Sequence, residues 1–150
     1  MRSIRSRAPS ASSTTVRRVM QANRSRDTKP EIQLRRALHR AGLRFRKDVR
    51  PLAPIKCAKA DVVFSRAKLC IFVDGCFWHG CPRHFSAPKT NQAWWKEKIA
   101  DNRLRDRKKT RQLRRAGWTV LRIWEHELQN ARFQSWVQQV SRLVSEGGPG

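Results

Sequence analysis

The sequence predicts an α/β protein in which a mixed central sheet is flanked by helices, and three observations lead to this fold class. Apolar runs at 61–65, 68–73 and 118–124 have the length and composition of strands. Segments at 28–41 and 133–144 repeat apolar residues at helical spacing, and a long charged segment at 90–116 also indicates a helix. The order of these elements is that of a sheet with helices packed against it.

The two ends of the chain are predicted to lie outside the folded domain. Residues 1–15 are rich in Arg and Ser and contain no apolar h-region, which indicates a disordered basic tail and no secretory signal. Residues 147–150, Gly-Gly-Pro-Gly, indicate a frayed C-terminus. Because 150 residues suit one domain, we expect a single domain over 16–146.

The first helix is predicted from its two end signals. It should begin at a capping box, Thr28-Lys-Pro-Glu31, and end at Gly42. The capping role accounts for the carboxylate of Glu31 without a further function. Apolar residues at 43, 45 and 49 then alternate with polar ones, which predicts a strand.

A hairpin is predicted between the runs 61–65 and 68–73. If the turn between them has two residues, Asp61 and Asp74 are diagonal neighbours on one face, roughly 7–8 Å apart between backbones. Carboxylates at that separation can converge on one Mg²⁺, whose oxygen ligands lie at about 2.0–2.1 Å. Acids near strand ends are otherwise solvated, and that alternative stays open. Acidic residues are scarce in this chain, which favours the metal site.

The long helix over 90–116 is predicted to end at Gly117. The run 118–124 that follows is too apolar for an edge strand, so we expect it in the centre of the sheet. The closing helix over 133–144 completes the fold.

Two polar residues of the long helix are predicted to face inward. Asn102 and Asp106 lie in one helical stripe with Trp95 and Ile99. An inward polar pair needs a partner. Three partners remain open: a metal-bound water, the imidazole of His79, or arginines of the same helix.

The charge of the chain predicts a polyanionic partner. Its 34 basic and 11 acidic residues give a formal net charge of +23. Such a charge opposes compaction unless a polyanion neutralises it, and nucleic acid is the expected partner. No run approaches the ~18 apolar residues of a membrane span. We expect a monomer without membrane contact, in the cytoplasm and associated with the nucleoid.

The cysteines are predicted to be metal ligands or buried thiols, since no secretory signal points to an oxidising compartment. Cys76, Cys81 and His84 supply three ligands within nine residues, and His126 is the natural fourth ligand of a structural Zn²⁺ site. Free thiols in a loop are the alternative. Cys70 is expected in the core and Cys57 in a loop. For His79, a zinc ligand, a general base and a phosphate contact remain open.

Two pairs of adjacent aromatic residues are candidates for contact with bases. These are Phe77 with Trp78, and Trp94 with Trp95. Exposed aromatics beside basic residues can act as wedges that enter the base stack. The alternative is that any one of these aromatic residues packs in the core, as large aromatic side chains usually do.

Several segments, in order and at compatible spacing, resemble the very short patch repair endonucleases, which nick DNA at mismatches. The resemblance runs from about Met20 to His126. Its most specific segments are Phe72-Val-Asp-Gly-Cys-Phe-Trp-His79, Pro88-Lys-Thr90, Trp95-x-x-Lys98-Ile99, Asn102-x-x-x-Asp106 and Ala116-Gly-Trp-x-Val120.

This resemblance implies a restriction-endonuclease-like fold with an added zinc site. It also implies nicking of double-stranded DNA 5′ to the thymine of a T·G mismatch that arises from deamination of 5-methylcytosine. Asp61 would be the main Mg²⁺ ligand, assisted by the main-chain carbonyl of Val73. His79 would be the general base, supported by Asp106.

The resemblance also implies roles for the remaining residues. Glu31 matches an acidic active-site residue, and Asp74 takes a position where some relatives carry histidine, with a role at the metal or in proton transfer. The expected DNA wedge is formed by Met20, Phe77, Trp78 and Trp95, with Met20 entering from the opposite side.

Two alternatives to a mismatch endonuclease remain. A non-catalytic, zinc-stabilised nucleic-acid-binding protein explains the charge and the Cys/His set but leaves Asp61, Asp74 and His79 without a function. A restriction-type nuclease that cuts both strands would need dimerisation, for which the sequence shows no sign.

Overall fold

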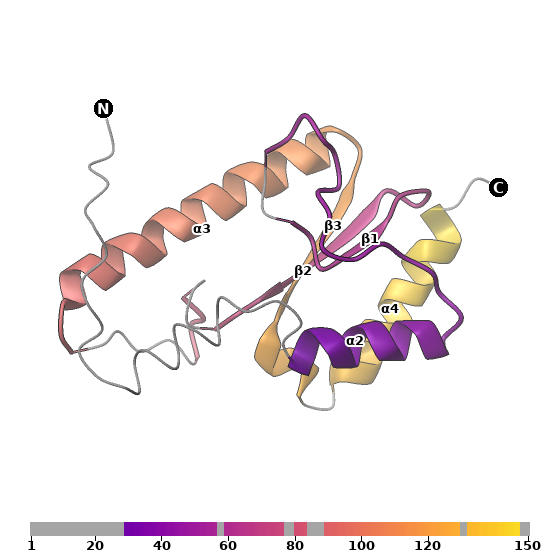
Figure 1. The fold of residues 1–150 in the computed structure, drawn as a ribbon, viewed down its shortest axis with the longest axis horizontal. Coiled ribbons are helices and arrows are strands. Elements are labelled where there is room, and N and C mark those ends of the chain that lie inside the picture. The colour runs from indigo at the N-terminus through magenta and orange to yellow at the C-terminus, as the bar shows by residue number, and fades with distance from the viewer. Residues whose placement is uncertain (1–28, 57–58, 77–79, 84–88, 130–131, 148–150) are drawn as a thin grey trace.

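The computed structural model describes residues 29–56, 59–76, 80–83, 89–129 and 132–147. It is an α/β fold with a three-stranded mixed sheet in the order β1-β2-β3. Strand β1 (Val62–Phe64) pairs antiparallel with β2 (Leu69–Asp74), and β2 pairs parallel with β3 (Thr119–Trp124). The parallel pair needs a long crossover, and α3 (Gln92–Arg115) provides it (Figure 1).

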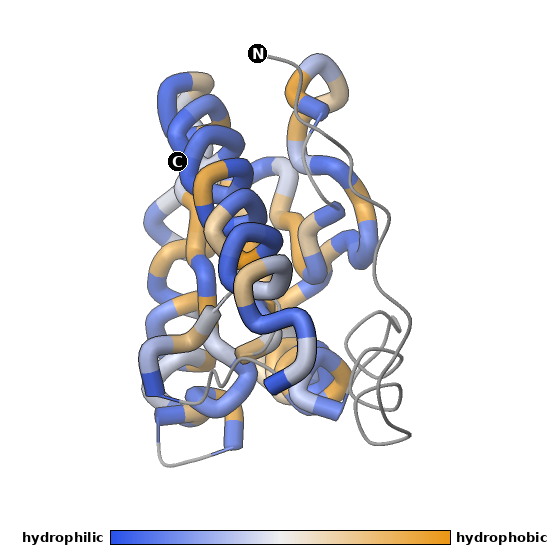
Figure 2. Tube along the Cα trace, turned by 90° about the vertical axis from the view of Figure 1, so that its left-hand side faces the viewer, coloured by the Kyte–Doolittle hydropathy of each residue, from blue (hydrophilic) through white to orange (hydrophobic). Residues whose placement is uncertain are grey.

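Helices cover both faces of the sheet. Helices α2 (Lys29–Arg40) and α4 (Arg132–Gly147), with the short 3₁₀ helix η1 (Glu125–Leu128), bury one face of the strands. Alternate strand residues, among them Val63 and Cys70, pack on the other face with Leu113 of α3. In Figure 2 hydrophilic and hydrophobic positions alternate along the helices, as one-sided packing requires. No helix in the described residues is both long and apolar enough to cross a membrane.

The helix ends follow the predicted signals closely. Gly42 and Gly117 adopt φ of 82° and 91°, the left-handed backbone that terminates helices. Helix α3 is the predicted long helix, shorter by a few residues at its ends. The proposed capping partner Thr28 lies outside the described residues, and within them Glu31 binds Arg35.

The register of the hairpin is confirmed. Phe64 stands opposite Leu69, and the N–H of Lys68 donates to the carbonyl of Ser65 across a two-residue turn. The ladder becomes irregular at Asp61, whose N–H donates to the carbonyl of Ile71 although Ile71 is the partner of Val62. This pattern resembles a β-bulge. The regular alternation of side chains between the two faces of the sheet therefore ends before Asp61. The predicted diagonal placement of Asp61 and Asp74 depends on that alternation.

Two strand predictions are wrong in part. The segment at 43–49 forms only isolated bridges, Arg46 with Val63 and Val49 with Ala60, because Asp48 between them has a left-handed backbone with φ of 52°. Strand β3 lies at the edge of the described sheet and not in its centre. Helices cover its two faces, and this explains its apolar composition without a second neighbouring strand.

Candidate active site

The carboxyl of Asp61 lies at the start of β1, where it bonds to the neighbouring strand. The main-chain N–H of Val73 donates to Asp61 Oδ2 at 2.6 Å. Asp61 is mostly buried, and burial is the main cause that raises its pKa from 3.8 to about 7. The hydrogen bond from Val73 lowers this pKa but does not offset the cost of burying the charge.

Charged residues of α2 and of the following loop surround Asp61. The carboxylates of Glu31 and Asp48 raise the pKa of Asp61, and the guanidinium of Arg35 lowers it. Arg35 is itself buried and donates to Glu31 Oε2 at 3.2 Å, and it lies 3.9 Å from Asp48 Oδ2. Three acids therefore share one arginine, an arrangement that favours an additional cation.

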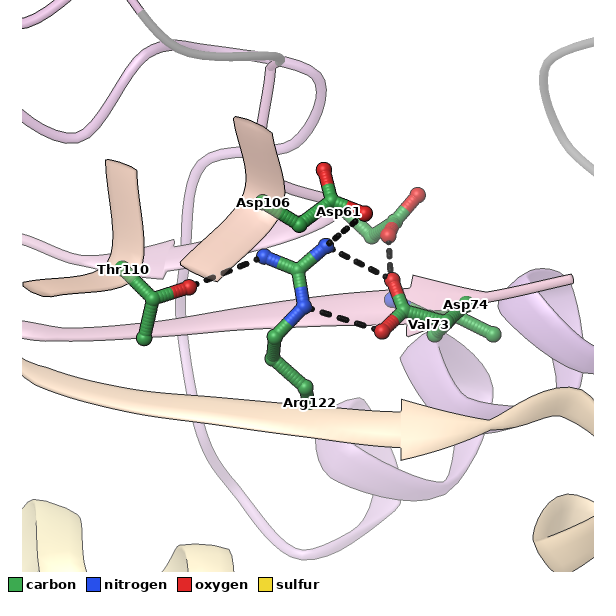
Figure 3. A network of polar contacts seen from close by, with 6 residues as sticks. All are labelled: Asp61, Val73, Asp74, Asp106, Thr110 and Arg122. Atoms are coloured by element: carbon green, nitrogen blue, oxygen red, sulfur yellow. Dashed lines mark hydrogen bonds and ion pairs between the residues drawn. The ribbon is translucent and has the colours of Figure 1, made fainter. Parts of the chain in front are cut away.

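Asp74, at the end of β2, is bound by an arginine that our sequence reasoning missed. Arg122 of β3 donates from Nε to Asp74 Oδ2 and from Nη2 to Asp74 Oδ1, both at 2.9 Å (Figure 3). The arginine also stacks over the ring of Phe72, with 4.6 Å from its central carbon to the ring centroid. Both oxygens of Asp74 are thus engaged in a bidentate ion pair.

Arg122 links the strand to the inward stripe of α3. Its Nη2 lies 3.6 Å from Asp106 Oδ2, and its Nη1 donates to the hydroxyl of Thr110 at 3.2 Å (Figure 3). Asn102 and Asp106 are half-buried on the face that carries Trp95 and Ile99, so the inward orientation is confirmed. One signal pointed to Arg122: it is the only charged residue in an apolar strand, and such a residue needs a partner.

Three of the four predicted zinc ligands lie together beyond β2. Ligand atoms of Cys76, Cys81 and His126 all lie within 4.8 Å of one another. His126 Nδ1 is 3.3 Å from Cys76 Sγ and 3.7 Å from Cys81 Sγ. The fourth, His84, lies outside the described residues. The cluster is a possible metal site that ties the end of β2 to η1.

The thiol of Cys76 is buried together with its neighbours. Burial raises the pKa of this thiol to about 12, and the carboxylate of Glu125, whose Oε1 accepts the Cys76 N–H at 3.1 Å, acts in the same direction. Without a cation the thiol therefore stays protonated. Cys70 is fully buried in the core, as predicted, and Cys57 lies outside the described residues.

Most of the predicted wedge lies outside the residues that the structure describes. Met20, Phe77, Trp78 and the predicted base His79 lie outside the described residues. Trp95 is only 3% exposed, and its ring meets the half-buried Trp94 edge to face, with 4.8 Å between ring centroids. In this conformation the side chain of Trp95 is buried. Its role as a wedge stays a prediction.

Comparisons with known proteins agree on one group of enzymes. A family model described as DNA mismatch endonuclease Vsr matches residues 11–84. The chain is 50% identical over 116 residues to the type II nicking enzyme V.NaeI of Lentzea aerocolonigenes, across 76% of this chain and 70% of that protein. It is 37% identical over 130 residues to the type II nicking enzyme V.NmeAIP of Neisseria meningitidis serogroup A, across 85% and 88%.

A third relative carries the name of the family model. The chain is 37% identical over 107 residues to the DNA mismatch endonuclease Vsr of Escherichia coli (strain K12), across 71% of this chain and 66% of that protein. The family match contains Asp61, Asp74, Cys76 and Cys81. Helix α3, β3 and Arg122 lie beyond it.

Proposed function

Because this chain belongs to the Vsr endonuclease family and is a hydrolytic DNA endonuclease, we propose that it nicks one strand of DNA 5′ to the thymine of a T·G mismatch. Such nicking would initiate very short patch repair. The observation that carries the proposal is the mostly buried carboxyl of Asp61, set among Glu31, Arg35 and Asp48. A group so placed is costly to ionise at neutral pH unless a cation compensates it.

The surroundings of Asp61 fit a Mg²⁺ ion. The N–H of Val73 points at the carboxyl of Asp61, and in a strand the C=O of a residue points to the same side as its N–H. Asp61 and the carbonyl of Val73 would therefore be the two protein ligands, with Glu31 near enough to act on the same charge. When bound, Mg²⁺ supplies an activated water and neutralises charge that builds on the phosphate.

The remaining groups would orient and move protons. His79 would act as the general base toward the attacking water, a role that rests on the resemblance in sequence. Asp106 would support it, with its own position held by Arg122. Asp74 would act through its ion pair with Arg122 and not as a metal ligand, because both of its oxygens are engaged.

We further propose that Cys76, Cys81, His126 and His84 hold one structural Zn²⁺. The donor set suits this ion, since thiolate and imidazole are its usual ligands and four ligands leave no open position. With the zinc site added, the mixed sheet between helices would be of the restriction-endonuclease type. The enzyme would work as a monomer on DNA in the cytoplasm, at the nucleoid, with residues 16–146 as its single domain.

Mismatch selection would come from the wedge. Phe77, Trp78 and Trp95, with Met20 from the opposite side, would enter the stack at the mismatched step. A mismatched pair opens at lower cost than a matched one, so part of the selectivity would precede any reading of base edges. One alternative to mismatch nicking is that the protein nicks a DNA sequence that contains no mismatch. The names of some relatives, type II nicking enzymes, favour this alternative.

A nicking assay tests the proposal. Matched and T·G-mismatched duplexes are incubated with the protein in Mg²⁺ and in EDTA, and the cut strand is mapped. We expect a single nick beside the thymine of the mismatched duplex, in Mg²⁺ only. Equal nicking of the matched duplex would support the alternative, and nicking in EDTA would exclude the metal site.

The variant Asp61→Ala assigns the metal ligand. It should lose nicking while DNA affinity is retained, because the loss of one negative charge from a chain of +23 does not weaken phosphate binding. Substantial Mg²⁺-dependent nicking by this variant would contradict the role of Asp61.

A further inference from the structure

A groove lies beside β3, the edge strand of the described sheet, and arginine forms much of its wall. It encloses about 850 Å³, and Asp74 and Asp106 of the candidate active site are among the residues that line it. Trp124 of β3 and Trp136 of α4 contribute apolar surface. The basic residues that line it are Arg103, Arg107, Arg111, Arg114 and Arg115 of α3 and Arg122 of β3.

Four of these arginines repeat at intervals of four residues. Arg103, Arg107, Arg111 and Arg115 therefore lie along one face of α3, about one helical turn apart, and together span ~18 Å. All four are exposed. Like charges at this spacing destabilise an isolated helix by a few tenths of a kcal/mol per pair. The four arginines of the row therefore destabilise α3 in isolation, and a polyanion bound beside them would remove this repulsion.

The acids in the groove do not neutralise this row. Asp74 and Asp106, the two acids that line it, both lie against Arg122. Across the part of the chain that the structure describes, no ion pair joins an acidic side chain to any of the four arginines of the row. The groove is thus a concave surface with an excess of positive charge, and two residues of the candidate active site line it.

We propose that this groove binds the phosphodiester backbone of the DNA strand on one side of the nick. The inference rests on the proposed nuclease site, because Asp74 and Asp106 of that site line the groove. One strand of duplex DNA carries a phosphate every ~3.4 Å of helix axis but winds around that axis, so a straight row of ~18 Å can follow only a few consecutive phosphates. The contacts reach phosphates and not base edges, so they set affinity and direction and leave sequence choice to other residues.

Neutral variants of the row test this surface against general attraction by net charge. The test variant is Arg107→Gln/Arg111→Gln/Arg115→Gln. The matched control, Lys96→Gln/Arg105→Gln/Lys108→Gln, removes three exposed charges from the same helix at positions that do not line the groove. Glutamine keeps the helix propensity close to that of the residues it replaces.

Duplex binding is measured against salt concentration for the parent and both variants. We expect the groove variant to bind at least about tenfold more weakly at 0.15 M salt, with a log–log salt slope smaller by about 2–3, since each lost phosphate contact removes about 0.9. The control should lose less than about twofold and keep its slope. Equal losses in both variants, or none in the groove variant, would overturn the proposal.

Duplexes with single uncharged methylphosphonate linkages locate the strand. The parent should lose affinity at several consecutive linkages on one side of the nick, and the groove variant should be insensitive to the same linkages. Sensitivity retained in the groove variant, or spread over both sides, would contradict the inference. The control variant should nick duplex DNA at a rate within about twofold of the parent. A parent that does not nick the duplex but keeps this binding pattern would contradict the proposed nuclease site alone.

Discussion

Two carboxyl groups in this protein, those of Asp61 and Asp74, are largely buried and therefore costly to ionise. Asp61 is mostly buried beside two other acids, and Asp74 has a side chain only 10% exposed. The surroundings compensate the charges of these two carboxylates to different extents. Arg122 neutralises Asp74 within the fold. The hydrogen bond from Val73 and the charge of Arg35, which also lies against Glu31 and Asp48, leave the pKa of Asp61 raised. Asp61 is therefore the residue with an uncompensated need for a cation.

The stability of the metal-free protein should consequently fall as the pH rises. The pKa of Asp61 is about 7 in the folded protein and near 3.8 when unfolded, so between these values the folded state binds a proton that the unfolded state does not. The contribution is present at low pH and is lost as the pH rises through 7. The variant Asp61→Asn cannot titrate at this position and should not lose stability in this way. The free energy of unfolding of the variant, relative to that of the parent, should therefore rise by a few kcal/mol from pH 5 to pH 8.

Urea denaturation at several pH values measures this difference. With Mg²⁺ present, the parent should regain stability at pH 8 and Asp61→Asn should not, since the amide is a poor replacement for a carboxylate ligand. A constant difference between variant and parent at all pH values would contradict the raised pKa of Asp61.

The ion pair of Arg122 predicts a large loss of stability on truncation. Arg122→Met leaves Asp74 and Asp106 without this partner, and an uncompensated buried charge costs about 3–5 kcal/mol. The double variant Arg122→Met/Asp74→Asn should recover part of the loss. Arg142→Met is the matched control, because Arg142 pairs with Glu146 where both side chains are about two-thirds exposed. It should cost under ~1 kcal/mol, and an equal loss in both single variants would refute the special role of Arg122.

Among the elements, β2 brings the most groups together. Its last residues lie between Asp61 on one side and Arg122 on the other, and the chain just beyond it enters the Cys/His cluster. Its central position explains this role. Pairing with β1 presents the N–H of Val73 to Asp61, and pairing with β3 places Asp74 level with Trp124, two residues before His126.

Local elements of this arrangement could be predicted from sequence, and its long-range partners could not. The hairpin register and the ends at Gly42 and Gly117 depend on neighbours within a few residues. Cys76 and Cys81 are close in sequence, so their meeting was also predictable. The pairing of Asp74 with Arg122 and the edge position of β3 depend on how strands far apart in sequence assemble, and periodicity carries no such information.

The Cys/His cluster predicts one zinc per chain that stabilises the junction between β2 and η1. Elemental analysis of protein purified without a histidine tag should give about one zinc, and Cys81→Ala should lose it and melt at lower temperature. Cys70→Ala is the matched control, since Cys70 is a buried thiol outside the cluster. Zinc near zero in the parent, or equal zinc in both variants, would contradict a site at this cluster.

At the scale of the whole molecule, the net charge of +23 opposes compaction. The row of arginines on α3 concentrates part of this repulsion on one face. Folding and polyanion binding are therefore linked, because a ligand that binds only the folded state stabilises it. The protein should be least stable in dilute salt without DNA.

A polyanion without sequence information should raise the melting temperature. Heparin at about one hundred times its dissociation constant adds ~2.7 kcal/mol, or about 5–10 °C for a domain of this size. At 0.5 M salt the shift should shrink, because screening removes the attraction. The melting temperature is followed by circular dichroism, with polylysine as the control. An unchanged melting temperature in heparin at low salt would show that self-repulsion does not limit stability.

The parallel pairing of β2 with β3 also sets the order in which the protein can form during synthesis. The hairpin of β1 and β2 is complete early, but His126 follows Cys76 by 50 residues. At about 5–20 residues per second the ribosome needs several seconds to cover that distance. During this interval the edge of β2 that later receives β3 has no partner strand, and the cysteines lack their distant imidazole. The nascent chain is then most prone to aggregate, and the closing of the Cys/His cluster marks the end of that period.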